Sequence, residues 1–128
     1  MKVLLDTNVL LWWLSDSPRL NAEARALIGD PAHEVLVSVA SLWEIAVKVR
    51  IGKLQADLGE IEDALDRQDL RRLAISPDHL RALIALPTHH RDPFDHLLIA
   101  QAISEAAIFL TGDRQLERYP ARIAAAGF

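Results

Sequence analysis

Four carboxylates in this sequence occupy positions from which they could act together as metal ligands. They are Asp6, Glu44, Asp95 and Asp113. Clustered carboxylates repel one another and raise one another's pKa values unless a cation lies between them. Oxygen ligands without histidine or cysteine suit a hard cation, Mg²⁺ or Mn²⁺. Such a cation activates a bound water and offsets charge on a phosphate, so the predicted chemistry is phosphodiester hydrolysis.

The secondary structure predicted around these acids explains how they could meet. Asp6 and Asp113 each follow a short apolar strand, predicted over Val3–Leu5 and Ala107–Leu110. The other two acids lie in the opening turns of predicted helices that begin at the same edge of the sheet. Open parallel sheets bind ligands beyond the carboxyl ends of their strands. We therefore expect all four carboxylates on one rim.

Strands that alternate with helices along the chain predict the fold class. We expect strands over 3–5, 34–37, 73–75, 107–110 and 123–125, and helices over 9–14, 21–28, 39–51, 58–70, 76–86 and 94–104. This order implies parallel crossovers and an α/β fold, a three-layer α/β/α sandwich around a parallel sheet of four to five strands. The chain has no repeat or linker, so we expect residues 1–128 to form a single domain.

Composition narrows the class of protein. The net charge of −4 argues against a simple polyanion binder, which would carry a basic excess. Bound cations could supply the positive charge that a phosphodiester substrate needs. The absence of cysteine excludes disulfides and thiolate metal sites. No apolar run reaches about 18 residues, so we expect no membrane segment and a cytoplasmic location.

All four acids also have structural interpretations. Asp6, which follows an apolar strand, could simply start a turn. Glu44 completes the pattern Ser41-x-x-Glu44 of a capping box. Asp95 would be favoured by the dipole of its helix, and Asp113 could cap a turn. Their shared placement with Asp6 on one rim, rather than any single residue, favours metal binding. Asp6→Ala should abolish cleavage yet leave the metal-free protein as stable as before, or more so, because it relieves carboxylate repulsion.

Four segments in order along the chain form a pattern shared with a known family. They are Leu5-Asp6-Thr7-Asn8, Ser41-Leu42-Trp43-Glu44-Ile45, His90-Arg91-Asp92-Pro93-Phe94-Asp95-His96-Leu97-Leu98-Ile99-Ala100-Gln101-Ala102 and Leu110-Thr111-Gly112-Asp113. Together they resemble the acidic motifs of PIN-domain proteins, and the third is closely similar to that of VapC-type toxins. The resemblance extends over nearly the whole chain.

The resemblance implies a function as well as a fold. It implies a Mg²⁺- or Mn²⁺-dependent endoribonuclease, the toxin of a type II (VapBC) toxin–antitoxin system. Asp6, Glu44 and Asp95 match the catalytic metal ligands of the family, and Asp113 matches its more variable fourth acid. The resemblance further implies an RNA substrate, a homodimer, and inhibition by a cognate VapB-like antitoxin.

Other polar residues beside these motifs are candidates for supporting the site or contacting substrate. They are Thr7, Asn8, Asp92, Thr111, Arg91 and Arg114. Asp92 precedes Pro93 and is most simply a helix N-cap, with direct metal ligation as the alternative. Thr7 and Asn8 could hydrogen-bond the ligating carboxylates, or could simply form a turn.

Basic and histidine residues near the motifs are open to two interpretations. Lys48, Arg50 and Lys53 follow Glu44 and could track RNA phosphates, although charges at a helix C-terminus are usually solvated. His89, His90 and His96 suggest zinc, but the first two are expected to precede the helix that carries the third. We therefore do not expect a zinc site.

Three alternative functions fit parts of the pattern. A haloacid-dehalogenase-like phosphatase also starts with an acid after its first strand, but it needs a second acid where this chain has Asn8. A receiver-like signalling domain needs an acidic pair after that strand, and only Asp6 is present. A non-catalytic PIN-like binding module would not need the acids that are intact here.

Overall fold

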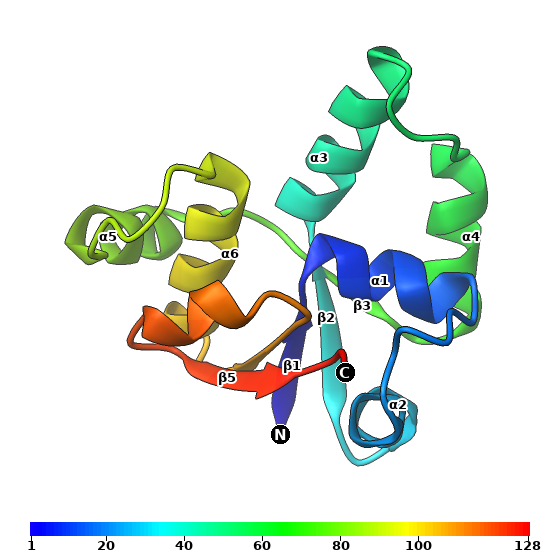
Figure 1. Cartoon of the computed structure of the whole chain (residues 1–128), viewed down its shortest axis with the longest axis horizontal. Helices are drawn as coiled ribbons and strands as arrows, with labels where there is room; N and C mark the ends of the chain where they lie inside the picture. Colours follow the sequence, from blue (N-terminus) through cyan, green and yellow to red (C-terminus); the bar gives the residue numbers. More distant parts are fainter.

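Five short parallel strands form the centre of the structure, a computed structural model that describes all residues from Met1 to Phe128. The strand order is β3-β2-β1-β4-β5, and every neighbouring pair is parallel. Helices cover both faces of the sheet (Figure 1). The predicted three-layer α/β/α fold with a parallel sheet is confirmed.

The elements are short and closely spaced. The strands are β1 (Lys2–Leu5), β2 (Glu34–Ser38), β3 (Arg71–Leu73), β4 (Ile108–Thr111) and β5 (Arg122–Ala125). The helices are α1 (Thr7–Leu14), α2 (Ala22–Gly29), α3 (Val39–Arg50), α4 (Leu58–Arg67), α5 (Pro77–Ala85), α6 (Pro93–Ser104) and the 3₁₀ helix η1 (Arg114–Arg118). Every α-helix starts after a polar N-cap whose side chain accepts a hydrogen bond from the first turn. These caps are Asp6, Asn21, Ser38, Asp57, Ser76 and Asp92.

Two apolar clusters hold the layers together, one on each face of the sheet. Alternate residues of a strand point to opposite faces, so Val3 and Leu5 pack under α1, α2 and α4. Leu4, between them, packs instead with α6 and with Phe109 of β4. The central strands are thus buried on both sides, which explains why they read as continuous apolar runs.

The strand order reverses between β1 and β4. From β1 the chain builds the sheet outward through β2 and β3, then crosses back to add β4 and β5 on the other side. Such a switch point leaves a crevice beyond the carboxyl ends of the two strands. Leu5 pairs with Leu110 there, and the backbone N–H of Asp6 donates to the Leu110 carbonyl at 2.9 Å.

Several predicted boundaries are wrong, and two share one cause. The helix predicted over 58–70 ends at Arg67, because Asp69 has a left-handed φ of 55° and turns the chain. Leu70 is then buried, and the strand predicted over 73–75 lies at Arg71–Leu73 instead. The first helix starts at Thr7 rather than at residue 9, since Asp6 caps it. η1 was not predicted at all.

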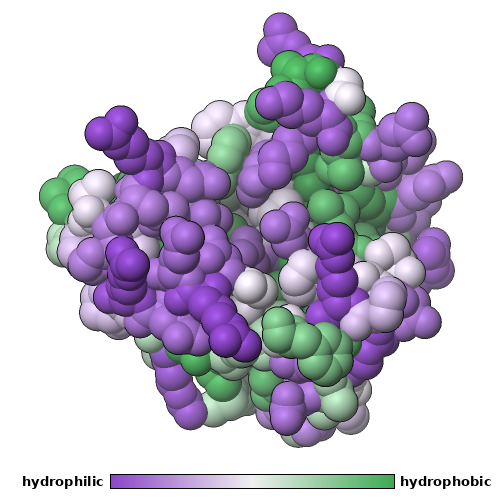
Figure 2. Space-filling model, viewed as in Figure 1, coloured by the Kyte–Doolittle hydropathy of each residue, from purple (hydrophilic) through white to green (hydrophobic).

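The surface is uneven in hydropathy. Figure 2 shows apolar side chains gathered over the space between α3 and α4, beside an otherwise polar surface. A groove of mixed character also runs between α1 and α4. Leu11, Leu14, Ala56 and Ile61 line it together with charged residues such as Glu60. No helix is long and apolar enough to cross a membrane.

Candidate active site

Asp6 is fixed by two hydrogen bonds at the end of β1. Its carboxylate accepts from the Thr7 backbone N–H at 2.7 Å and from the Thr111 hydroxyl at 2.6 Å. The second bond exists because β1 and β4 are neighbours that end together. Burial raises the pKa of Asp6, and the charges of Glu44 and Asp113 add to this, while the two hydrogen bonds oppose it. Asp6 is only 6% exposed.

Glu44 faces Asp6 from the second turn of α3. Its Oε1 accepts from the Thr7 hydroxyl at 2.8 Å, and its Oε2 pairs with Lys48 Nζ at 2.9 Å. The capping-box interpretation of Glu44 is wrong: Ser38 caps α3, and Ser41 lies buried inside the helix. Glu44 is therefore free of any role in starting its helix.

Asp92 and Asp95 have different roles at the start of α6. Asp92 is the N-cap, as predicted, and its Oδ1 accepts from the N–H groups of Phe94 at 2.9 Å and Asp95 at 3.3 Å. Pro93 occupies the first helical position, where its missing N–H costs nothing. This cap leaves the side chain of Asp95 free to point away from its own helix.

Asp95 carries the most perturbed carboxyl group at the rim. Its Oδ2 lies 3.1 Å from His90 Nε2, within hydrogen-bond distance, and its side chain is 17% exposed. Burial is the main cause that raises its pKa to about 8. Nearby negative charges raise it further, and they belong to Asp6, Asp92, Glu44 and Asp113.

Asp113 lies in the loop that leaves β4 and caps η1. Its carboxylate accepts from the Gln115 N–H at 2.9 Å, and its own N–H donates to the Thr111 hydroxyl at 3.0 Å. Gly112 allows the Trp12 ring to pack on this loop, since a Cβ there would lie 2.5 Å from the ring. Asp113 is the exposed member of the group.

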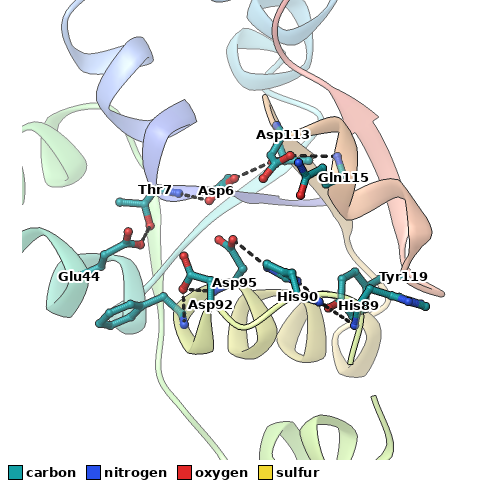
Figure 3. A network of polar contacts seen from close by, with 12 residues as sticks. Asp6, Thr7, Glu44, His89, His90, Asp92, Asp95, Asp113, Gln115 and Tyr119 are labelled. Atoms are coloured by element: carbon teal, nitrogen blue, oxygen red, sulfur yellow. Dashed lines mark hydrogen bonds and ion pairs between the residues drawn. The ribbon is translucent and has the colours of Figure 1, made fainter. Parts of the chain in front are cut away.

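The four predicted acids converge on one rim, from four separate segments (Figure 3). The charges of the other three all act on Asp95. The buried Ser38 hydroxyl donates to Gln101 at 2.5 Å and links the start of α3 to α6. As they stand, no three acidic or histidine side chains lie close enough together to hold one ion.

The supporting residues predicted from sequence fall into two groups. Thr7 and Thr111 contact the acids directly. Asn8, Arg91 and Arg114 are exposed beside the rim. Lys48, proposed from sequence as an RNA contact, pairs with Glu44 in this structure. Arg50 and Lys53 are exposed farther along α3 and after it.

The three histidines cluster around a residue that the sequence analysis overlooked, Tyr119. The rings of His89, His90 and His96 all lie edge-on to the Tyr119 ring, with centroids 4.9–6.0 Å apart. Tyr119 is the only tyrosine of the chain and carries no motif. Only its position after η1, a helix that was not predicted, brings it to the histidines.

Comparison with known proteins extends this picture. The chain is 29% identical to Ribonuclease VapC22 of Mycobacterium tuberculosis (strain ATCC 25618 / H37Rv) over 119 residues. This aligned stretch covers 91% of each protein. It is 41% identical over 64 residues to Ribonuclease VapC16 of the same organism, 47% of this chain and 44% of the relative. The chain is thus similar to VapC ribonucleases along most of its length.

Solved structures show the same fold. VapBC2 from Rickettsia felis, solved bound to a DNA fragment from its promoter, matches with a TM-score of 0.72 and 19% identity over 98% of this chain and 99% of that one. VapBC-5 from Mycobacterium tuberculosis matches with a TM-score of 0.63 and 23% identity over 99% and 98%. Residues 3–122 match the family described as PIN domain, and the chain belongs to that family.

Proposed function

We propose that this protein is a Mg²⁺- or Mn²⁺-dependent endoribonuclease and the toxin of a VapBC-type toxin–antitoxin pair. The observation that carries the proposal is the convergence of Asp6, Glu44, Asp95 and Asp113 at the switch point of a PIN fold. The similarity to Ribonuclease VapC22 over most of the chain supports RNA as the substrate.

The donor set fits a hard divalent cation. Asp6, Glu44, Asp95 and Asp113 would hold it, with oxygen atoms alone. Their mutual repulsion, which contributes to the raised pKa values of Asp6 and Asp95, would be relieved by a positive ion between them. Because no three of these groups are close enough as they stand, binding requires side-chain rotation at the rim. When bound, the ion would activate a water and offset charge on the scissile phosphate.

The chain's own residues would prepare the site for that ion and for RNA. Thr7 and Thr111 hold the Asp6 carboxylate in one orientation. Lys48 pairs with Glu44, and release of that carboxylate to a metal would free the ammonium for a phosphate. Exposed side chains at Asn8, Arg91 and Arg114 border the same rim and could contact the RNA backbone.

Partners follow from the same assignment. The solved structures similar to this chain include toxin–antitoxin complexes. We therefore propose a cognate VapB-like antitoxin, which would place a basic side chain such as arginine against the carboxylates and displace the metal. The groove between α1 and α4 offers apolar surface for a protein partner. We also expect a homodimer.

Family membership decides among the alternatives considered from sequence. The haloacid-dehalogenase-like and receiver-like functions belong to other families, and a receiver-like sheet would have the strand order 2-1-3-4-5. A PIN-fold binding module without catalysis is the alternative that experiment must separate from the nuclease.

The decisive experiment is cleavage of pooled tRNA and rRNA by the purified chain. We expect cleavage with Mn²⁺ or Mg²⁺, none with EDTA, and none by Glu44→Gln. Glu60→Gln, which changes an exposed acid on α4 away from the rim, is the matched control and should cleave normally. Folded wild-type protein that cleaves nothing at millimolar Mn²⁺ would favour the binding module. Expression alone should be toxic, and co-expression of the adjacent antitoxin gene should relieve the toxicity.

A further inference from the structure

We infer that Tyr119 and His90 are positioning residues that hold Asp95 at the rim, through hydrogen bonds from phenol to imidazole to carboxylate. The inference rests on the proposed metal-dependent function and assigns a role to two residues outside the acidic set. It is carried by the contacts around the Tyr119 hydroxyl, which are drawn in Figure 3.

The hydrogen-bond partners of Tyr119 fix the direction of the first bond. Its oxygen accepts from the backbone N–H groups of His89 at 3.0 Å and His90 at 3.2 Å. A phenolic oxygen has only one hydrogen to give. The remaining contact, at 2.6 Å to His90 Nδ1, is therefore the bond that the hydroxyl donates.

That donation fixes the tautomer of His90 and thus the second bond. With Nδ1 acting as the acceptor, the hydrogen of a neutral imidazole lies on Nε2. Nε2 lies 3.1 Å from Asp95 Oδ2 and donates to it. The same oxygen accepts from no other protein group, and Oδ1 accepts from none. His90 therefore engages one carboxylate oxygen and leaves the other available for an ion.

Asp95 needs such a restraint more than the other acids do. Four acidic groups surround it, and they would repel the Asp95 carboxylate in the ionised form that binds a metal. Asp6 is held by two donors and Glu44 by two, whereas Asp95 has His90 alone. Figure 3 shows the Asp95 carboxylate pointing from α6 toward Asp6, with His90 beside it. Loss of this donor would free the carboxylate to leave the site.

The position of Tyr119 links two of the acids. η1 is capped by Asp113 at its start and is followed directly by Tyr119, which is 3% exposed. The phenol therefore connects the segment that carries Asp113 to the loop that precedes α6. These hydrogen bonds fix the position of the Asp95 motif relative to the Asp113 motif, although the two acids are 18 positions apart in sequence.

The first test measures Mn²⁺ affinity, by titration calorimetry, for the whole chain. Tyr119→Phe keeps the ring that packs against the histidines and removes only the hydroxyl. Loss of His90, the direct partner of Asp95, should lower Mn²⁺ affinity about 10–100-fold. Because the Tyr119 hydroxyl acts on Asp95 only through His90, we expect Tyr119→Phe to lower the affinity by up to that amount. His89→Gln is the matched control, because the His89 side chain packs on the same phenol and only its backbone N–H bonds to it. It should bind Mn²⁺ like the wild type.

The second test separates positioning from packing. His90→Gln can place an amide N–H near Asp95 and should retain much of the Mn²⁺ affinity, whereas His90→Leu should lose it. In cleavage assays, excess Mn²⁺ should restore the kcat of Tyr119→Phe, since the defect lies in metal affinity. A purely structural role for Tyr119 would instead lower kcat at every Mn²⁺ concentration, and that result would overturn the inference.

A spectroscopic readout requires neither metal nor RNA. Above about pH 8, where an ordinary imidazole is neutral, the ¹⁵N shifts of His90 in the metal-free protein should report hydrogen on Nε2. Tyr119→Phe should give a mixture of tautomers.

Wild-type Mn²⁺ binding with unchanged affinity in Tyr119→Phe would refute this inference and leave the proposed function intact. Absence of Mn²⁺ binding to the wild type would overturn both.

Discussion

Asp6 and Asp95 occupy the same rim, but the chain supports their charges differently. Asp6 lies at the end of a central strand, where a helix N-terminus and the neighbouring strand each supply a hydrogen-bond donor. Asp95 lies in the first turn of α6, whose N–H groups are already capped by Asp92. It has one donor and four negative neighbours, and its pKa rises to about 8.

The difference indicates that an acid's place in its strand or helix decides whether it supports local structure in addition to binding metal. A carboxylate after a strand serves its own helix as N-cap, so its removal disturbs local structure. A carboxylate at the third helical position, behind another cap, contributes nothing to its helix beyond a favourable dipole interaction. We therefore expect Asp6 to combine both roles and Asp95 to be kept for metal binding.

The largest expected effect is on catalysis and should be the same for both acids. Asp6→Asn and Asp95→Asn each remove a proposed metal ligand, so cleavage of RNA should fall by more than about 100-fold. Initial rates on a fixed RNA substrate at saturating Mn²⁺ measure this, with Glu60→Gln as the control. Near-normal cleavage by either variant would remove that residue from the metal site.

Stability should separate the two acids where activity does not. Asp6→Ala leaves the Thr7 N–H and the Thr111 hydroxyl without their buried acceptor, at a cost of about 1–3 kcal/mol. This reverses the expectation from sequence alone, which considered only repulsion. Asp95→Ala should stabilise the metal-free protein near pH 7, because folding at that pH forces the Asp95 carboxyl to take up a proton that it lacks in the unfolded chain, and alanine has no such cost. Urea unfolding of both variants tests the contrast, and equal destabilisation would contradict it.

The pH dependence of stability sharpens the comparison further. The folded-state pKa of Asp95, about 8, lies above the unfolded value near 4, so the folded state binds the extra proton between them. The stability that this proton provides is complete below about pH 4 and is lost as the pH rises through about 8. Urea midpoints of the metal-free protein should therefore fall more between about pH 5 and pH 9 for the wild type than for Asp95→Asn. Parallel curves would show that Asp95 is not the titrating group.

The sequence predicted the features that depend on short-range pattern and on the end of each strand. Asp6 and Asp113 could be placed together because parallel strands end at one edge, and Asp92 could be recognised as a cap from the proline that follows it. The third strand was misplaced by two residues, because its edge position leaves arginines where a buried strand would have apolar residues.

Individual side-chain contacts were beyond the sequence pattern. Lys48 lies four residues after Glu44 on one helix, a spacing that permits an ion pair but fits a solvated charge equally well. Tyr119 reaches His90 only through a 3₁₀ turn whose polar sequence has no helical periodicity. The contact between Tyr119 and His90 depends on where η1 places Tyr119 beside the loop that precedes α6, which is decided by tertiary structure.

The smallest expected effect concerns Asp92, the acid that neighbours Asp95 without sharing its role. Asp92 accepts from two N–H groups of α6, and asparagine caps helices equally well, so Asp92→Asn should keep its fold and most of its activity. Asp92→Ala should lose about 0.5–2 kcal/mol of stability in urea unfolding. The charge of Asp92 also helps to raise the pKa of Asp95, so Asp92→Asn should lower that pKa. The urea midpoint of the metal-free protein should then depend less on pH. If Asp92→Asn stays folded yet cleaves no better than Asp95→Asn, Asp92 is itself a metal ligand, and its assignment to helix capping alone is wrong.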